Sequence, residues 1–308
     1  MSSAAPGALI EALSGTIVGQ AEVVRSLVLA LIAGGHVLLE GPPGLAKTLA
    51  CRALAAALDG EFKRIQFTPD LLPADITGTR IFDQRSAQFS TVLGPVFANI
   101  VLADEVNRAP AKVQSALLEA MQERQVTIGP ATHELPDPFL VLATMNPIDA
   151  DGTYALPHAQ MDRFLLKIAV TFPGVQEELR ILERFAVNDT QPLHGIATLA
   201  DVRAWRVQAH AVHLDSSVKR YIVDLTAATR AANGYVEYGA SPRASLALAF
   251  TARALAFIEG RDFVLPDDVR VLAPAVLAHR IAYTHRLLVD RVQPLEFVQA
   301  LVQAVPAP

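Results

Sequence analysis

Five short apolar runs, separated by helical or loop segments, constrain the fold of this chain more than any other feature of its sequence. They lie at residues 36–39, 62–67, 100–103, 139–143 and 164–170. The runs show no alternation with polar residues, which is typical of strands buried on both faces of a parallel sheet. They predict an α/β fold in which a five-stranded parallel sheet lies between layers of helices.

The pattern changes after Pro173. Apolar residues at helical spacing predict helices at residues 176–185, 199–212, 216–232, 241–259, 266–280 and 294–304, with no strand among them. We therefore expect two domains, an α/β domain over residues 1–173 and an all-helical domain over residues 174–308. Two further stretches, residues 79–93 and 126–135, are predicted to be hairpins inserted into the α/β domain.

Composition narrows the class of protein. Hydrophobic residues make up 52% of the 308 residues and charged residues 19%, so a core is easily built and wholesale disorder is excluded. The formal net charge of -5 argues against a protein that coats nucleic acid through bulk charge. The single cysteine, Cys51, excludes an internal disulfide and fits a reducing compartment. With no visible secretory signal or membrane-spanning stretch, we expect a cytoplasmic protein that does not insert into membranes.

A glycine- and proline-rich turn follows the first predicted strand and opens a helix. It consists of Gly41, Pro42, Pro43, Gly44, Leu45, Ala46, Lys47 and Thr48. Backbone N–H groups and a helix N-terminus in such a turn can cradle phosphates. Lys47 can reach the β- and γ-phosphates, and the Thr48 hydroxyl can join a Mg²⁺ shell. Ala46 replaces the usual second glycine, which we expect to be tolerated in a first helical turn. The alternative is an ordinary loop with an incidental lysine.

Two carboxylates follow the apolar run at residues 100–103. Ligands gather at the carboxyl ends of parallel strands, so Asp104 and Glu105 are expected to face the same crevice as the phosphate loop. Asp104 suits Mg²⁺, usually through water, and Glu105 suits the base that orients the attacking water. A solvated acidic turn is the alternative for this pair alone. Together with the phosphate loop, the pair predicts a nucleotide hydrolase.

Two more candidates follow the later strands. Asn146 ends the strand at residues 139–143, where its amide could bond the γ-phosphate or the attacking water; the alternative is an Asn-Pro turn. Arg163 precedes the fifth strand. It is either an ion-pair partner of Asp162 or an arginine finger supplied to a neighbouring subunit.

Arg243 is the candidate in the helical part of the chain. Ser241 is expected to cap a helix whose first position is Pro242, which places Arg243 in the first turn. A cation there opposes the helix dipole, so the sequence offers no local reason for it. A bound phosphate would supply one.

Taken together, these motifs resemble the MoxR family of AAA+ ATPases. The likeness rests on residues 17–20, 41–48, 104–110, 146–147 and 239–244, and it spans nearly the whole chain. The family also carries alanine before the lysine of its phosphate loop. The resemblance implies a P-loop αβα core with a helix-2 insert at residues 79–93, followed by a helical lid.

The resemblance also implies a role for each candidate residue. Residues 41–48 would form Walker A, and Asp104 and Glu105 Walker B. Asn146 would be sensor 1, Arg163 the arginine finger and Arg243 sensor 2. The remaining ATP contacts would come from Val18, Gly19, Gln20 and Leu49.

By the same resemblance, ATP and Mg²⁺ bind between core and lid of a ring, typically a hexamer. Such rings act as chaperones that assemble or activate protein complexes, often by inserting a metal cofactor, with a von Willebrand factor A domain partner. No nucleic acid is expected. Two residues depart from the family pattern: His158 replaces a common Glu, and Met145 replaces the usual Gln before Asn146.

Three other functions stay open at the level of sequence. One is a nucleic-acid-directed motor on the same core, against which the acidic charge and the lack of a basic stripe count. Another is a magnesium-chelatase-like subunit, which shares the helix-2 insert. The third is an adaptor that binds ATP without turnover, which would need neither Glu105 nor Arg163.

Overall fold

A five-stranded parallel sheet forms the centre of the molecule, as the apolar runs predict. The computed structural model describes residues 5–42, 44–85, 87–146, 154–186, 193–231 and 234–308. The sheet order is β2-β5-β8-β1-β9, and every neighbouring pair is parallel. Its strands are β1 (Val37–Glu40), β2 (Phe62–Gln66), β5 (Ile100–Asp104), β8 (Leu140–Met145) and β9 (Leu166–Ala169).

Burial along the sheet differs between its centre and its edge. The central strands β5, β8 and β1 are buried over almost their whole length. The prediction of burial on both faces is wrong for β2, where Lys63 and Arg64 are exposed. β2 is an edge strand, so one side of it faces solvent and tolerates charge.

Helices cover both faces of the sheet. Alternate residues of β1 and β5 belong to different buried clusters: Leu39 and Leu102 face one side, and Leu38 and Val101 face the other. The first cluster includes α1 (Pro6–Thr16), α2 (Ala21–Ala33) and α3 (Lys47–Ala57), and the second includes α4 (Pro73–Thr77) and α5 (Ala111–Glu123). This is the αβα layering expected from the sequence.

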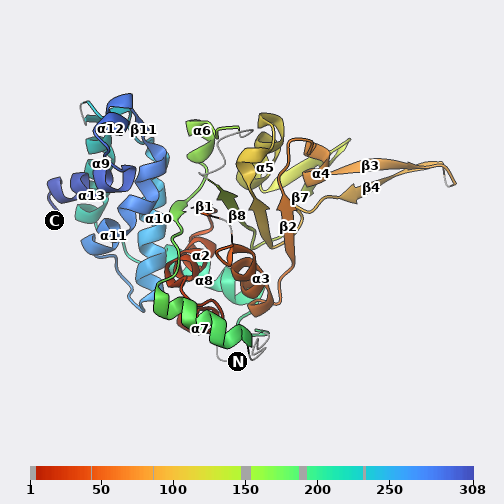
Figure 1. Ribbon diagram of the computed structural model, residues 1–308, viewed down its shortest axis with the longest axis horizontal. Helices are drawn as coiled ribbons and strands as arrows, with labels where there is room; N and C mark the ends of the chain where they lie inside the picture. The colour runs from red at the N-terminus through yellow and green to blue at the C-terminus, as the bar shows by residue number, and fades with distance from the viewer. Residues whose placement is uncertain (1–4, 43, 86, 147–153, 187–192, 232–233) are drawn as a thin grey trace.

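Two hairpins extend the α/β part. They are β3 (Gly78–Asp83) with β4 (Gln88–Leu93), and β6 (Gln125–Ile128) with β7 (Ala131–Glu134), close to the predicted ranges. Figure 1 shows β3 and β4 projecting far from the rest of the molecule. Every residue of β4 is exposed, so this hairpin contributes little to the core.

The C-terminal part is mostly helical. Its helices are α7 (Val175–Ala186), α8 (Leu199–Ala211), α9 (Ser216–Ala231), α10 (Pro242–Ile258), α11 (Pro266–Leu277), α12 (His285–Val289) and α13 (Pro294–Ala304). The expectation of helices alone is wrong, because β10 (Val236–Tyr238) pairs with β11 (Ala282–Tyr283) in a small antiparallel sheet. Strands of two and three residues are too short to produce a periodic pattern.

Helices α9 to α13 lie on one side of the molecule and the β3–β4 hairpin on the other, while α7 and α8 lie between them, near α2 and α3 in this view (Figure 1). Helices α8 and α10 both contact α2, and their buried side chains join the cluster on that face of the sheet. The domain boundary at residue 173 stays a prediction. Among the helices that the structure describes, none has the length and apolarity that crossing a membrane requires.

Candidate functional site

A cavity of about 280 Å³ opens at the carboxyl ends of β1, β5 and β8. The phosphate-loop residues in its wall are Gly41, Gly44, Leu45, Ala46, Lys47 and Thr48. The strand ends contribute Arg64, Gln66, Asp104, Glu105, Thr144, Met145 and Asn146. The cavity therefore brings the predicted phosphate loop, both carboxylates and Asn146 to one place. Pro42 is described but does not line the cavity, and Pro43 and Pro147 lie outside the described residues.

Close approaches fix the phosphate loop. A Cβ on Gly41 would lie 2.5 Å from the Val170 carbonyl oxygen, so only glycine fits there. The Lys47 Nζ donates to the Gly41 carbonyl at 2.9 Å, which folds the lysine back over the loop. Gly44 has a φ of 83° and Ala46 a φ of 54°.

The sequence leads us to expect Ala46 in the first helical turn, and this expectation is wrong. The helix α3 begins at Lys47, and Ala46 is the residue before it, in the left-handed region that favours glycine. The loop therefore holds an alanine in a strained conformation, as functional loops often do.

The Lys47 ammonium is partly withdrawn from water. Burial lowers the pKa of Lys47, while the nearby carboxylates of Asp104 and Glu105 act in the opposite direction. A bound polyphosphate would add negative charge beside this ammonium and favour its protonated form. The electrostatics therefore suit an anionic ligand.

Thr144 links the two carboxylate residues. Its hydroxyl donates to Asp104 Oδ1 at 2.6 Å and accepts from the Glu105 backbone N–H at 2.8 Å. Glu105 has a φ of 57°, so this bond helps to hold it in a left-handed conformation. The Glu105 side chain forms part of the cavity wall.

Side chains from the edge strand β2 complete this wall. Arg64 Nη2 donates to Asp104 Oδ2 at 2.6 Å, and Gln66 Nε2 donates to Glu105 Oε2 at 2.9 Å. Arg108 also pairs with Glu105, at 3.2 Å. The sequence reasoning missed Arg64, Gln66 and Thr144. A signal exists for the first two, since residues two apart on a strand share one face.

A second, mainly apolar cavity of about 350 Å³ adjoins the first. Both cavities share Gly44, Leu45 and Ala46. The other walls of the second are Thr16, Ile17, Val18, Gln20, Leu49, Pro173 and Ile181. Gly19 does not line it, but a Cβ at Gly19 would lie 3.0 Å from the Pro173 Cβ. A polar compartment next to an apolar one suits a ligand with a phosphate chain and a flat apolar base.

The cavity near the phosphate loop also has suitable ligands for Mg²⁺. Thr48 and Asp104 offer a hydroxyl and a carboxylate, which are the hard oxygen donors that Mg²⁺ prefers, with water and phosphate completing its shell. Nowhere in the described ranges do three His, Cys, Asp or Glu side chains converge as a metal site of their own. The residues therefore fit a Mg²⁺ ion that arrives with a nucleotide.

Arg163 and Arg243 line neither cavity. Strands β1 and β9 are parallel, and Val37 pairs with Leu166. Arg163 precedes β9 and therefore lies at the amino ends of these strands, whereas the phosphate loop follows the carboxyl end of β1. Asp162 pairs with Arg280 at 3.0 Å, and the described residues show no ion pair between Asp162 and Arg163. The Nε of Arg163 is buried without a described hydrogen-bond partner.

Cys51 is fully buried in the helix behind the phosphate loop, and burial raises the pKa of its thiol. The thiolate is disfavoured there, so Cys51 is a small core residue rather than a nucleophile.

Comparisons with known proteins identify the family and support the fold. The family model described as "ATPase family associated with various cellular activities (AAA)" matches residues 36–166, and a model of the AAA lid domain matches residues 228–300. Chaperone MoxR1 of Mycobacterium tuberculosis is 48% identical over 95% of this chain and 79% of its own length. Protein MoxR of Paracoccus denitrificans is 35% identical over 88% of this chain and 86% of its own.

A solved structure is also similar throughout. A crystal structure of a protein from Cytophaga hutchinsonii superposes with a TM-score of 0.91 at 43% identity, covering 97% of this chain and 94% of that one. The AAA family match at residues 36–166 includes Gly44, Leu45 and Ala46, which line both cavities.

Proposed function

Because the chain belongs to the MoxR family of AAA+ ATPases, we propose that it hydrolyses ATP at the interfaces of a subunit ring and remodels protein complexes. The observation that carries this proposal is the cavity that gathers Lys47, Asp104, Glu105 and Asn146 around one phosphate loop. Residues 1–173 would act as the ATPase core and residues 174–308 as the lid.

ATP would lie across both cavities. The triphosphate follows the loop of Gly41, Pro42, Pro43, Gly44, Leu45, Ala46, Lys47 and Thr48, with Lys47 facing the β- and γ-phosphates. The adenine occupies the apolar cavity beside Val18, Gln20 and Leu49. Gly19 joins Val18 to Gln20 in the turn that forms the rim of this cavity. The Gln20 amide donates to the Thr171 carbonyl at 3.3 Å, which supports a fixed position for this rim.

Mg²⁺ would be held by the Thr48 hydroxyl and, through water, by Asp104. When bound, it neutralises part of the phosphate charge. The chain's own contribution is positional: Thr144 and Arg64 hold the two Asp104 oxygens in place.

Glu105 would orient the attacking water and accept its proton, and the Asn146 amide would hold the water or the γ-phosphate. Gln66 bonds one Glu105 oxygen and Arg108 pairs with the same oxygen, which supports a fixed carboxylate direction. Positioning of this kind is the main source of catalysis in phosphoryl transfer.

Arg163 and Arg243 would complete the site of a neighbouring subunit. Neither side chain lines the nucleotide cavities of its own subunit, and Arg163 keeps a buried Nε that no described group satisfies. A finger that acts between subunits requires a ring, and the family favours a hexamer.

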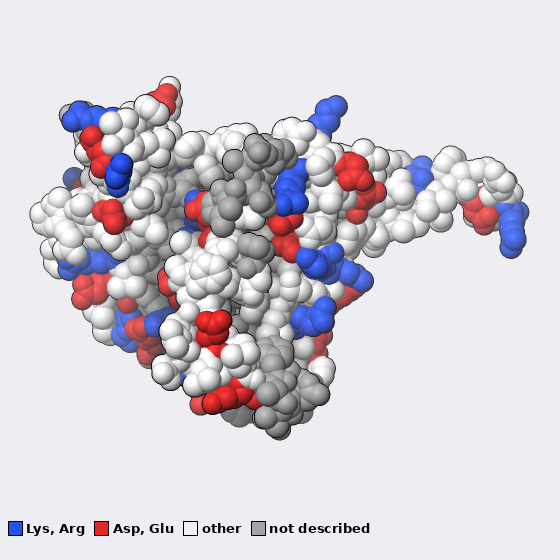
Figure 2. All heavy atoms as spheres, in the orientation of Figure 1, with Lys and Arg blue, Asp and Glu red and all other residues white. Residues whose placement is uncertain are grey.

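Beyond hydrolysis, we place the chain among chaperones that assemble or activate protein complexes in the cytoplasm. Its relative in M. tuberculosis is named a chaperone. Insertion of a metal cofactor and a von Willebrand factor A domain partner are part of the proposal. Lys and Arg lie among Asp and Glu on the face in Figure 2, so that face offers no basic stripe for the nucleic-acid alternative.

The test is ATP turnover per subunit as a function of protein concentration, with Glu105→Gln as the blank. We expect a rate that rises with assembly and then saturates, because each site needs two subunits. Arg163→Ala should lower kcat by about 10³-fold or more while ATP still binds. Arg220→Ala is the matched control, since Arg220 is an exposed arginine paired with Asp224 within α9.

A constant rate per subunit, in a range where light scattering shows dissociation, would mean that each subunit is complete alone. Turnover by Arg163→Ala at the wild-type rate would remove the finger from the proposal.

A further inference from the structure

We infer that Asp162 and Arg280 are positioning residues that hold the Arg163 turn and the N-terminus of α10 together, so that Arg163 and Arg243 act on a neighbour's nucleotide as one unit. This inference rests on the proposed function. It adds two residues outside the nucleotide cavity and a physical link between the helical part and the finger.

Arg280 is a buried cation with an unusually complete set of partners. Its side chain is 3% exposed. The guanidinium donates to Asp162 Oδ1 at 3.0 Å, to the Phe164 carbonyl at 2.6 Å, to the Leu165 carbonyl at 3.1 Å and to the Val276 carbonyl. A buried charge is strongly unfavourable without such partners, so the orientation of these groups is tightly determined.

Three of these partners belong to one short segment. Asp162, Phe164 and Leu165 surround Arg163 in the turn between α6 (His158–Met161) and β9. Arg280 lies more than a hundred residues away, in the short 3-10 helix Ala278–Arg280 that follows α11. A residue of the helical part therefore holds the Arg163 turn, in addition to backbone bonds within the turn and one from Leu165 to His36.

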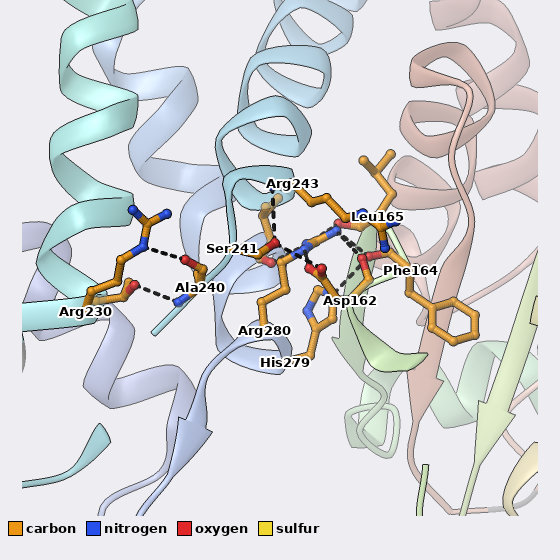
Figure 3. A network of polar contacts seen from close by, with 11 residues as sticks. Asp162, Phe164, Leu165, Arg230, Ala240, Ser241, Arg243, His279 and Arg280 are labelled. Carbon is orange, nitrogen blue, oxygen red and sulfur yellow. Dashed lines mark hydrogen bonds and ion pairs between the residues drawn. The ribbon is translucent and has the colours of Figure 1, made fainter. Parts of the chain in front are cut away.

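Asp162 extends this connection to α10. Its second oxygen, Oδ2, accepts from the Ser241 hydroxyl at 3.0 Å, and Ser241 in turn caps α10 by accepting from the Arg243 backbone N–H at 3.2 Å. Figure 3 shows Arg280 and Ser241 converging on Asp162. The carboxylate of Asp162 thus connects the Arg163 turn to the first turn of α10, which carries Arg243.

Electrostatics agree with this geometry. Burial lowers the pKa of Arg280 to about 10, Asp162 opposes that shift, and the positive charge of Arg243 adds to it. The two Ser241 bonds place the first turn of α10, which carries Arg243, beside the Arg163 turn.

The consequence for the reaction is one of orientation. A catalytic group displaced by about 1 Å can lose about a hundredfold in rate. Loosening the Asp162–Arg280 pair would weaken the attachment of the Arg163 turn to the helical part, although the bond between His279 and the Phe164 carbonyl remains. The rate of hydrolysis would fall although the nucleotide cavity itself is unchanged.

The experiment compares Asp162→Asn and Arg280→Lys with wild type. We expect kcat to fall by about 10- to 100-fold, while KM and the affinity for ATP change by less than about twofold, because neither residue lines the cavities. Arg261→Lys is the matched control. Arg261 pairs at 2.7 Å with Asp268, whose side chain is 6% exposed, but it does not touch the finger turn. It should keep the wild-type kcat even where its melting temperature falls.

A mixing experiment separates positioning from a merely structural role. Asp162→Asn subunits keep an intact nucleotide cavity, and Glu105→Gln subunits keep an intact finger turn. Mixed rings should therefore turn over faster than rings of either variant alone, with ring formation followed by sedimentation.

Wild-type kcat in both variants, no recovery in mixed rings, or loss of ring assembly in both would overturn the inference. If Arg163→Ala itself turns over normally, the proposed function fails instead. A dead Arg163→Ala beside fully active Asp162 and Arg280 variants would refute the inference alone.

Discussion

At the residue scale, the candidate site uses backbone conformations that its side chains do not favour. Ala46 and Glu105 both have positive φ angles, at 54° and 57°, and both line the phosphate cavity. Each such residue costs on the order of 1 kcal/mol, which the surrounding structure must offset. The bond between Thr144 and the Glu105 N–H is one visible offset.

The buried side chain of His36, the residue before β1, links strand β8 to helix α5. Its Nδ1 accepts from the Val141 N–H at 3.0 Å, so the Nε2–H donates to the Met121 carbonyl at 3.2 Å. Burial, with the nearby Arg124, lowers the pKa of His36 from 6.5 to about 3. The native state therefore holds a neutral imidazole.

His36 should make the protein less stable in acid. The unfolded chain binds a proton at His36 below pH 6.5 and the folded chain only near pH 3, so stability is lost as pH falls between these values. His36→Gln lacks this titration. Urea unfolding at several pH values should show a steeper decline for wild type, by about 1.4 kcal/mol per pH unit for one proton. Parallel curves would contradict the assignment.

At the element scale, the β3–β4 hairpin stands apart from the packed layers. Phe82 and Phe89 face each other across it with ring centres 5.0 Å apart, and Arg80 lies 4.7 Å from the Phe89 ring. Both aromatic side chains remain about half exposed. The hairpin is thus stabilised mainly by its own cross-strand contacts.

Phe89→Ser should therefore lower the free energy of unfolding by at most about 1 kcal/mol, the range of a cross-strand pair. Phe139→Ala, at a fully buried position beside the sheet, should cost about 3–5 kcal/mol. Urea denaturation measures both, and ATP binding should be unchanged in Phe89→Ser. Equal losses for the two variants would mean that the hairpin is part of the core.

The elements that the sequence predicts well are those whose residue pattern extends over several consecutive positions. The central strands of the sheet are predicted because each is an apolar run, whereas β2 is predicted as a strand although it contains Lys63 and Arg64. Ser241 is predicted as a cap because its chemistry is local. Strands β10 and β11 were missed because they are too short to show a period.

Other features depend on contacts between distant parts of the chain. Thr144 resembles an ordinary residue of a buried strand until its hydroxyl is seen between Asp104 and Glu105. Asp162, Phe164 and Leu165, which bond to Arg280, lie more than a hundred residues from it in sequence. No local pattern can reveal such a pairing.

At the scale of the whole molecule, ATP should stabilise several separate segments together. The apolar cavity is built from residues 16–20, 44–49 and 173–181, which come from three parts of the chain. Ligand at about 100 times its Kd adds about 2.7 kcal/mol to the free energy of unfolding.

Hydrogen exchange in a Glu105→Gln background, where ATP persists, should show slower exchange in all three segments. Lys47→Ala should abolish the effect, because its phosphate contact is lost. Slower exchange confined to residues 44–49 would place the adenine outside the apolar cavity.

The phosphate cavity lies at the carboxyl ends of the sheet strands, and the Arg163 turn lies at their amino ends. A head-to-tail contact places the phosphate cavity of one subunit against the Arg163 turn of the next, and the same contact can repeat along a stack. An open stack of n subunits then has n−1 complete sites, and joining its two ends completes the last one through a contact that every other pair already makes.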